Sequence, residues 1–138
     1  MARRIVYSGK NNQDDSLVVG NHGPVQIVIK GDFYINGLVY CPKHRLQIYI
    51  KGNGRLALRG ICKKIDIIRV NGNCVIDLEA LKLSELELEE LKGHTELIIG
   101  NIKQIRKGNI DEEVLSINSS NKVHYTAASE TIISTSAL

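Results

Sequence analysis

The chain has 138 residues, of which 43% are hydrophobic and 24% are charged, and its formal net charge is +3. This length suits one domain, and the charge is too small to indicate nucleic-acid or membrane-surface binding by itself. No apolar run is long enough for a membrane span or a signal peptide, so we expect no transmembrane segment. We expect a cytoplasmic protein, or a secreted or surface protein if the chain is a processed or truncated form.

In chain order, residues 1–17 are interpreted as an N-terminal extension or cap. Val18 and Val19, followed by the run VQIVI from Val25, predict strands that lead into a repeated domain at residues 18–118. Residues 119–138 are rich in Ser and Thr and are interpreted as a C-terminal cap or tail. Within them, KVHYTA and ETIISTSAL are expected to be capping strands or part of a mobile tail.

Four similar segments follow one another through the centre of the chain: IKGDFYING, IKGNGRLALRG, VNGNCVIDLEA and LKGHTELIIGN. Each contains a glycine, and the glycines are 21, 20 and 21 residues apart. The glycines of this turn row are Gly31, Gly52, Gly72 and Gly93. Gly supplies the positive φ that a sharp turn needs, and a period near 20 with several short strands is typical of a solenoid.

Aliphatic residues recur at fixed distances from these glycines, and we expect them to form inward-facing rows. The row two residues before the glycine is Ile29, Ile50, Val70 and Leu91. The rows four and nine residues after it are Ile35, Leu56, Ile76, Leu97 and Tyr40, Ile61, Leu81, Ile102. The residues directly after the glycine, Asp32, Asn53, Asn73 and His94, are expected to form a polar ladder at one corner.

The fold class predicted from this repeat is all-β: a right-handed parallel β-helix or β-solenoid with about 20–21 residues per coil. RKGNIDEEVLSI is interpreted as a degenerate fifth copy. A leucine-rich repeat has a similar period and is the competing interpretation. We rank it second because three of the four copies lack its leucine spacing and its consensus Asn.

The stretch DLEALKLSELELEELKG, Asp77 to Gly93, has the composition of a helix. In a helix, however, its leucines would point all round the axis, although six acidic residues lie among them. Leu81 and Leu83 share one face of a strand, as do Leu86 and Leu88. The step of three residues from Leu83 to Leu86 breaks the alternation, so we predict short strands joined by a bend there.

IKGNGRLAL from Ile50 and VNGNCVIDL from Val70 fit the unit I-x-G-x-G-x-[IL]-x-[LA], with Cys for the second Gly in the latter. On these segments, about residues 29–102 resemble the auto-transporter adhesin head GIN domains. This resemblance implies a right-handed parallel β-helix. The chain is also somewhat similar to the bactofilins, cytoplasmic β-solenoids that polymerise end to end. Neither resemblance supplies catalytic residues.

Cysteine and histidine positions predict no catalytic, cofactor or metal site. Cys41 and Cys62 lie ten residues after their glycines, so we expect stacked neighbours about 4.8 Å apart, which is within disulfide range. Two partly buried thiols in one row are favoured over a redox bridge or half a metal site. Cys74 is assigned to packing, and the four histidines occupy unrelated repeat positions.

Charged residues are interpreted mainly as solvated faces. The acids from Asp77 to Glu90 alternate with leucines, which favours an outward strand face over an acid/base pair that cleaves polysaccharides. A basic flank is expected to follow the stack; solubility and edge protection are favoured as its role over binding to an acidic protein or a polyanion, which is the alternative. We expect no specific nucleic acid, because no aromatic residues interleave with these cations. The flank consists of Lys43, Arg45, Lys63, Lys64, Lys103 and Arg106, together with Lys82 and Lys107.

The sequence therefore favours a non-enzymatic structural protein that forms homo-oligomers or filaments through the open ends of its solenoid. The alternative is an adhesin-like or carbohydrate-binding module that uses an exposed β-face. Exposed aromatic residues would favour that alternative, and Tyr34, Tyr40 and Tyr49 are the candidates, although Tyr40 is expected in an inward row. An enzyme on a β-helix is the third interpretation.

Overall fold

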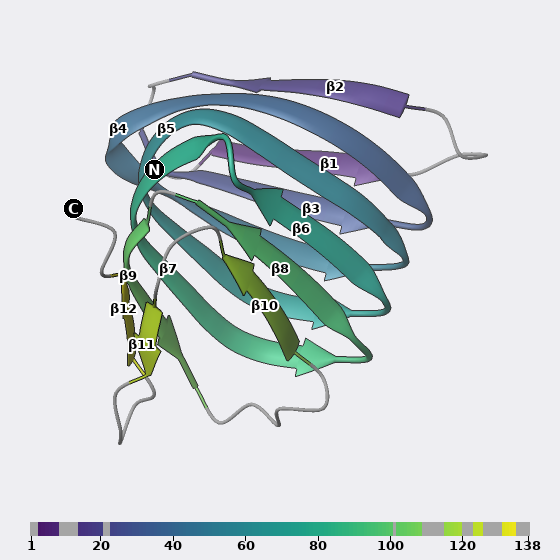
Figure 1. Ribbon diagram of the computed structural model, residues 1–138. Helices are drawn as coiled ribbons and strands as arrows, with labels where there is room; N and C mark the ends of the chain where they lie inside the picture. Colours follow the sequence, from purple (N-terminus) through teal and green to yellow (C-terminus); the bar gives the residue numbers. More distant parts are fainter. Residues whose placement is uncertain are drawn as a thin grey trace.

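The computed structural model describes residues 3–8, 14–20, 23–100, 102–108, 115–119, 123–125 and 131–134. All the regular secondary structure within these residues is β-strand. The strands coil around one apolar core (Figure 1). The fold is a β-solenoid of about five stacked turns, so the predicted all-β solenoid is confirmed. The strands are β1 Arg3–Ser8, β2 Asp14–Val19, β3 Val25–Lys30, β4 Phe33–Lys51, β5 Gly54–Asn71, β6 Cys74–Leu78, β7 Leu81–Lys92, β8 Thr95–Ile99, β9 Ile102–Lys107, β10 Leu115–Ser119, β11 Val123–Tyr125 and β12 Thr131–Ser134.

The strands stack in two parallel series, because β4 and β5 are long enough to run through both sides of a coil. The first series contains β2, the N-terminal parts of β4 and β5, β6, β8 and β10. The second contains β1, β3, the C-terminal parts of β4 and β5, β7 and β9. Each coil therefore pairs in register with the coil before it, as the repeat of 20 or 21 residues predicts.

Two of the predicted inward rows are present as predicted. Ile29 pairs with Ile50, Ile50 with Val70, and Val70 with Leu91. Ile35, Leu56, Ile76 and Leu97 pair in the same way across the other series. All eight side chains are buried. Each aliphatic side chain thus packs between its counterparts in the adjacent coils, which removes apolar surface from water along the whole stack.

The third predicted row is right only in part, because Leu81 and Ile102 are buried whereas Tyr40 and Ile61 are not. Tyr40 is 59% exposed, and it pairs with Ile61, which in turn pairs with Lys82. The inward row at this corner is instead Cys41, Cys62, Leu83 and Ile102. Asp77 lies 20 residues after its partner Ala57, whereas Leu81 lies 21 residues after its partner Gly60, so the turn at Glu79 and Ala80 adds one residue to this coil. A fixed count from the glycine therefore does not reach the same place in every coil.

The stretch that resembles a helix in composition is extended. The last residues of β6 are followed by a turn at Glu79 and Ala80, and β7 then runs from Leu81 to Lys92. Leu81, Leu83 and Leu86 are all buried in the core. The predicted extended structure is confirmed, because tertiary packing of the leucines outweighs the helix propensity of the stretch. The predicted position of the bend, between Leu83 and Leu86, is wrong, because β7 runs unbroken through these residues and the turn lies at Glu79 and Ala80.

The two ends of the solenoid differ. At the N-terminal end β1 and β2 pair in parallel with β3 and β4, in the region where the sequence predicts an extension or cap. At the C-terminal end β10 continues the first series on β8, whereas β12 pairs antiparallel with β9 and β11 pairs antiparallel with β12. Parts of the proposed fifth copy and of the Ser/Thr-rich segment lie outside the described residues.

Among the described residues, none forms a helix that is long and apolar enough to cross a membrane.

Candidate functional site

The glycine row makes the corner where each coil begins. Gly31, Gly52, Gly72 and Gly93 all have positive φ, between 84° and 151°. A Cβ on Gly52 would lie 1.9 Å from the carbonyl oxygen of Gly31, and a Cβ on Gly72 would lie 2.0 Å from that of Gly52. The backbones of successive coils thus approach too closely at this corner for any side chain, so glycine is required by both conformation and space.

The polar residues after these glycines form a hydrogen-bonded ladder. The Oδ1 atom of Asn53 accepts a hydrogen bond of 2.8 Å from the backbone N–H of Asn73. The Oδ1 atom of Asn73 accepts one of 3.0 Å from the backbone N–H of His94. Asp32 lies at the equivalent exposed position of the preceding coil. Two asparagine side chains therefore link three coils at an exposed corner.

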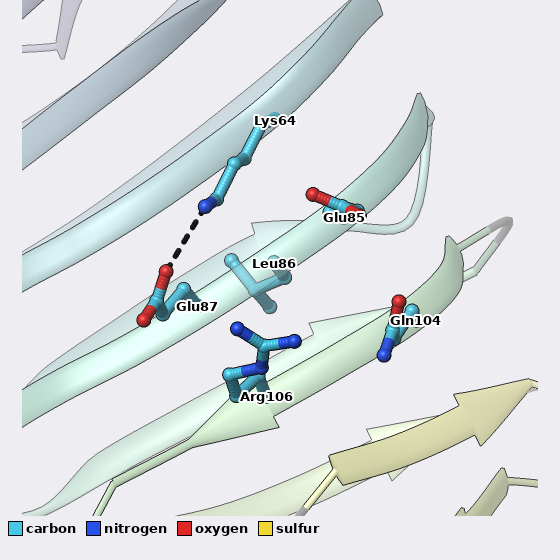
Figure 2. A pocket seen from close by; sticks show the side chains of 6 residues that line it. All are labelled: Lys64, Glu85, Leu86, Glu87, Gln104 and Arg106. Carbon is cyan, nitrogen blue, oxygen red and sulfur yellow. Dashed lines mark ion pairs between the residues drawn. The ribbon is translucent and has the colours of Figure 1, made fainter.

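A network of opposite charges lies on the outer face of the second series. Asp66 is almost fully buried and is approached by Arg45 at 3.3 Å and by Lys64 at 3.5 Å. The Nζ atom of Lys64 also lies 3.0 Å from Oε2 of Glu87 on the next coil (Figure 2). Arg45 and Lys64 were predicted to belong to a basic flank. In the structure both form ion pairs with acidic residues of their own chain.

Burial sets the protonation behaviour of this network. Desolvation raises the pKa of the Asp66 carboxyl, although the charges of Lys64 and Arg45 oppose the rise. Burial, together with the charge of Glu87, also raises the pKa of the Glu89 carboxyl. The hydrogen bond to Glu87 raises the pKa of the Lys64 ammonium, so this side chain stays charged at neutral pH.

A shallow hollow lies beside this network (Figure 2). The side chains that line it come from three adjacent strands and carry both signs of charge. They are Lys64 of β5, Glu85, Leu86 and Glu87 of β7, and Gln104 and Arg106 of β9. Such a mixed lining does not favour either a purely anionic or a purely cationic ligand.

The other basic residues do not continue as one flank. Lys63, Lys82 and Lys103 line a second hollow at the corner, next to Ser84, and all three lysines are exposed. Lys43 is exposed on β4. The assignment of Lys107 to the flank is wrong, because Lys107 pairs with Leu88 in an inward row and is only 4% exposed. Binding of a polyanion by the exposed lysines stays a prediction.

Two further acids of the third coil, Asp77 and Glu90, also have basic neighbours. Asp77 forms an ion pair with Arg55 of the preceding coil, and it accepts a hydrogen bond of 3.0 Å from the backbone N–H of Glu79. Glu90 lies 3.2 Å from Arg69 and 3.6 Å from Lys92. These pairs join side chains on neighbouring coils or on one strand, so their main effect is to balance charge along the outer faces.

The three cysteines are buried and free. Cys41 and Cys62 are directly paired neighbours on adjacent coils, as predicted. Burial raises the pKa of the Cys62 thiol to about 12 and that of Cys74 to about 11. The Sγ atom of Cys62 lies 3.3 Å from the carbonyl oxygen of Lys64.

Within the described part of the chain, no group of three or more His, Cys, Asp or Glu side chains is placed to hold a metal ion.

Exposed apolar side chains are concentrated in the first two coils. Tyr34, Leu38 and Tyr40 point outward from β4 and are 44%, 41% and 59% exposed. Val18 of β2 is 69% exposed and pairs with Leu38. Tyr34 was predicted from the sequence to be an exposed aromatic residue. That Tyr40 lies on the same outer face of β4 was not predicted.

Comparisons of the chain with models of known protein families, with curated proteins and with solved structures found no significant match.

Proposed function

We propose that this chain is a non-enzymatic structural protein that associates with further copies of itself through the ends of its solenoid. The observation that carries this proposal is the position of β1 and β2. Among the described strands β1 pairs with β3 alone and β2 pairs with β4 alone. The outer backbone groups of an edge strand are a template for pairing with another chain, because unpaired N–H and C=O groups gain hydrogen bonds there.

The chemistry of the side chains supports a structural role. The charged groups of the second series are bound mainly to one another, as in the contacts of Lys64 with Asp66 and Glu87. The raised pKa of Cys62 keeps its thiol protonated, which makes it a poor nucleophile. Neither feature provides an activated group for catalysis among the described residues.

Sedimentation analysis of the purified chain over a wide concentration range tests the proposal. We expect species heavier than the 15.3 kDa of one chain, in a proportion that grows with concentration. A protein that sediments as a single chain at the highest attainable concentration contradicts the proposal.

A second candidate is a binding module that uses the outer face of β4, in an adhesin-like or carbohydrate-binding role. The observation that favours it is the exposure of Tyr34 and Tyr40 on one face, with Asn36 between them. Flat aromatic rings beside hydrogen-bonding groups suit sugar rings, which have apolar faces and polar edges.

A glycan array tests this candidate, with the double variant Tyr34→Ala and Tyr40→Ala as the comparison. We expect binding that both substitutions abolish, whereas Tyr49→Ala, a half-buried tyrosine of the other series, leaves it intact. An array on which the wild-type chain binds nothing contradicts the candidate.

A further inference from the structure

Among the described residues, no further coil covers the apolar side chains at the N-terminal end of the solenoid. Ile5, Tyr7 and Leu17 point inward and pack against the core, yet they are only partly buried. Their counterparts one coil further on, Ile27 and Ile29, pair with Ile5 and Tyr7 and are fully buried. The difference arises because β1 and β2 are the first strands of the stack. A terminal coil that is exposed to water normally has a polar outer face.

The outward side of the same two strands carries one exposed valine on each strand, beside the exposed polar residues Arg4, Ser8 and Ser16. Val6 of β1 is 54% exposed and Val18 of β2 is 69% exposed. Both strands are six residues long, so the end presents two open edges of equal length. Long edges with apolar side chains are what soluble monomers avoid, because they recruit other chains.

The C-terminal end is less open. In the second series the edge of β9 is covered by β12, and the outermost strand there is β11, which has only three residues. In the first series β10 ends the described stack with five residues. The antiparallel β12 and β11 interrupt the parallel stack on one side, so a second copy cannot extend both series at this end as well as it can at the other.

From this difference between the ends we infer that two copies of the chain join through their N-terminal ends in a closed, two-fold symmetric dimer, rather than head to tail in a filament. The inference rests on the proposed self-association and specifies its geometry. A two-fold axis across the interface pairs β1 with β1 of the partner copy and β2 with β2 of the partner copy, both antiparallel. Both open edges are then satisfied at once, and no edge of this end remains for a third copy.

The side-chain pattern restricts how these edges can meet. Residues that lie opposite each other in an antiparallel pair point to the same face, so inward Ile5 and Tyr7 must meet inward residues. A register that centres on Val6 places Ile5 opposite Tyr7 of the partner copy, and a register that centres on Leu17 places the two Leu17 side chains opposite each other. In these registers the named inward residues of the two copies meet across the interface, which removes apolar surface from water.

Single introduced cysteines distinguish the two geometries. In the full chain, Val6→Cys places an accessible thiol at the N-terminal end, and Ser116→Cys places one on β10 at the other end. Each variant is treated with a short bis-maleimide. The wild-type chain is the control, since its three cysteines are buried and are expected to react only slowly.

We expect Val6→Cys alone to give a covalent dimer as its main product and Ser116→Cys alone to give none. Cross-linking that occurs only when the two variants are mixed indicates a head-to-tail arrangement; it overturns the closed dimer and leaves the proposed self-association intact. No cross-linking in any sample, together with sedimentation as a single chain, overturns both.

Charge substitutions give an independent measurement. Val6→Lys together with Val18→Lys puts like charges close to the two-fold axis, so we expect dimerisation to weaken by about tenfold or more. Val75→Lys is the matched control, because Val75 is an outward-facing valine of β6 in the middle of the stack. Circular dichroism establishes that each variant is folded. Equal weakening by both sets of substitutions overturns the inference.

Discussion

The side-chain oxygen of Asn53 accepts a hydrogen bond of 2.8 Å from the backbone N–H of Asn73, one coil further along the stack. The side-chain oxygen of Asn73 accepts a similar bond of 3.0 Å from the backbone N–H of His94. Such bonds compete with water at an exposed corner, so each contributes little by itself. Their value lies in fixing the register of neighbouring coils at the point where the chain turns.

Replacing Asn53 by Ala removes one rung of this ladder. We expect the free energy of unfolding to fall by about 0.5–1.5 kcal/mol, because the backbone N–H of Asn73 loses its partner but remains accessible to water. Asn53→Asp keeps an acceptor oxygen and should lose less. Denaturant titration measures both, and Asn71→Ala, at an exposed position outside the ladder, is the control. Equal losses for Asn53→Ala and Asn71→Ala argue against a stabilising ladder.

The residues close to each glycine could be placed from the sequence alone. Ile29, Ile35 and Asn53 lie within four residues of a repeat glycine, and the coils superpose well over that distance. The regular spacing of the glycines and the strict alternation of side chains in a strand are sufficient to define those rows.

Beyond the next corner the same reasoning fails, because small differences in coil length accumulate. Tyr40 was expected inside the core and is exposed, and Lys107 was expected on the surface and is buried. The extra residue at the turn of Glu79 and Ala80, and the register shift between Cys41 and Arg45, are local irregularities that a single sequence does not reveal.

The ion pairs between coils were missed, although the sequence contains a signal for them. Arg69 and Glu90 are 21 residues apart and Arg55 and Asp77 are 22 apart, which is close to the length of a coil. Opposite charges at the period of the repeat would have predicted neighbours across coils. The burial of Asp66 among such pairs could not have been predicted in this way, since it depends on side-chain packing.

Gly52→Ala tests the turn row. The added Cβ would lie 1.9 Å from the carbonyl oxygen of Gly31, and the backbone would need a φ of 151°. We expect a loss of about 3 kcal/mol or more in the free energy of unfolding, measured by denaturant titration. Gly108→Ala is the matched control, because there the nearest atom to an added Cβ is 3.5 Å away. A Gly52→Ala chain as stable as the Gly108→Ala chain contradicts the assignment.

The thiols of the folded chain should react very slowly with small thiol reagents. With a pKa of about 12, only about one Cys62 in 10,000 is a thiolate at pH 8, and the sulfur is also buried. We expect all three cysteines to be labelled rapidly in denaturant and at most slowly without it, as measured by absorbance. Stoichiometric labelling of a cysteine in the folded chain within minutes contradicts the burial of these side chains.

The raised pKa of Asp66 predicts how stability depends on pH. A carboxyl whose pKa is higher in the folded state than its ordinary value of 3.8 binds its proton more tightly when folded. Its favourable contribution is therefore complete at lower pH and is lost as the pH rises through this window. Asp66→Asn removes this dependence while it keeps the shape of the side chain.

We therefore expect the free energy of unfolding of Asp66→Asn, relative to that of the wild-type chain, to increase as the pH rises from just below 4 towards neutrality and then to level off. Denaturant titrations at a series of pH values measure this difference. Gln47→Glu, which places a carboxyl at the half-buried neighbouring position paired with Asp66, tests whether any added charge there has the same effect. A difference that decreases with pH would mean that Lys64 and Arg45 outweigh burial, and the assigned direction of the shift would then be wrong.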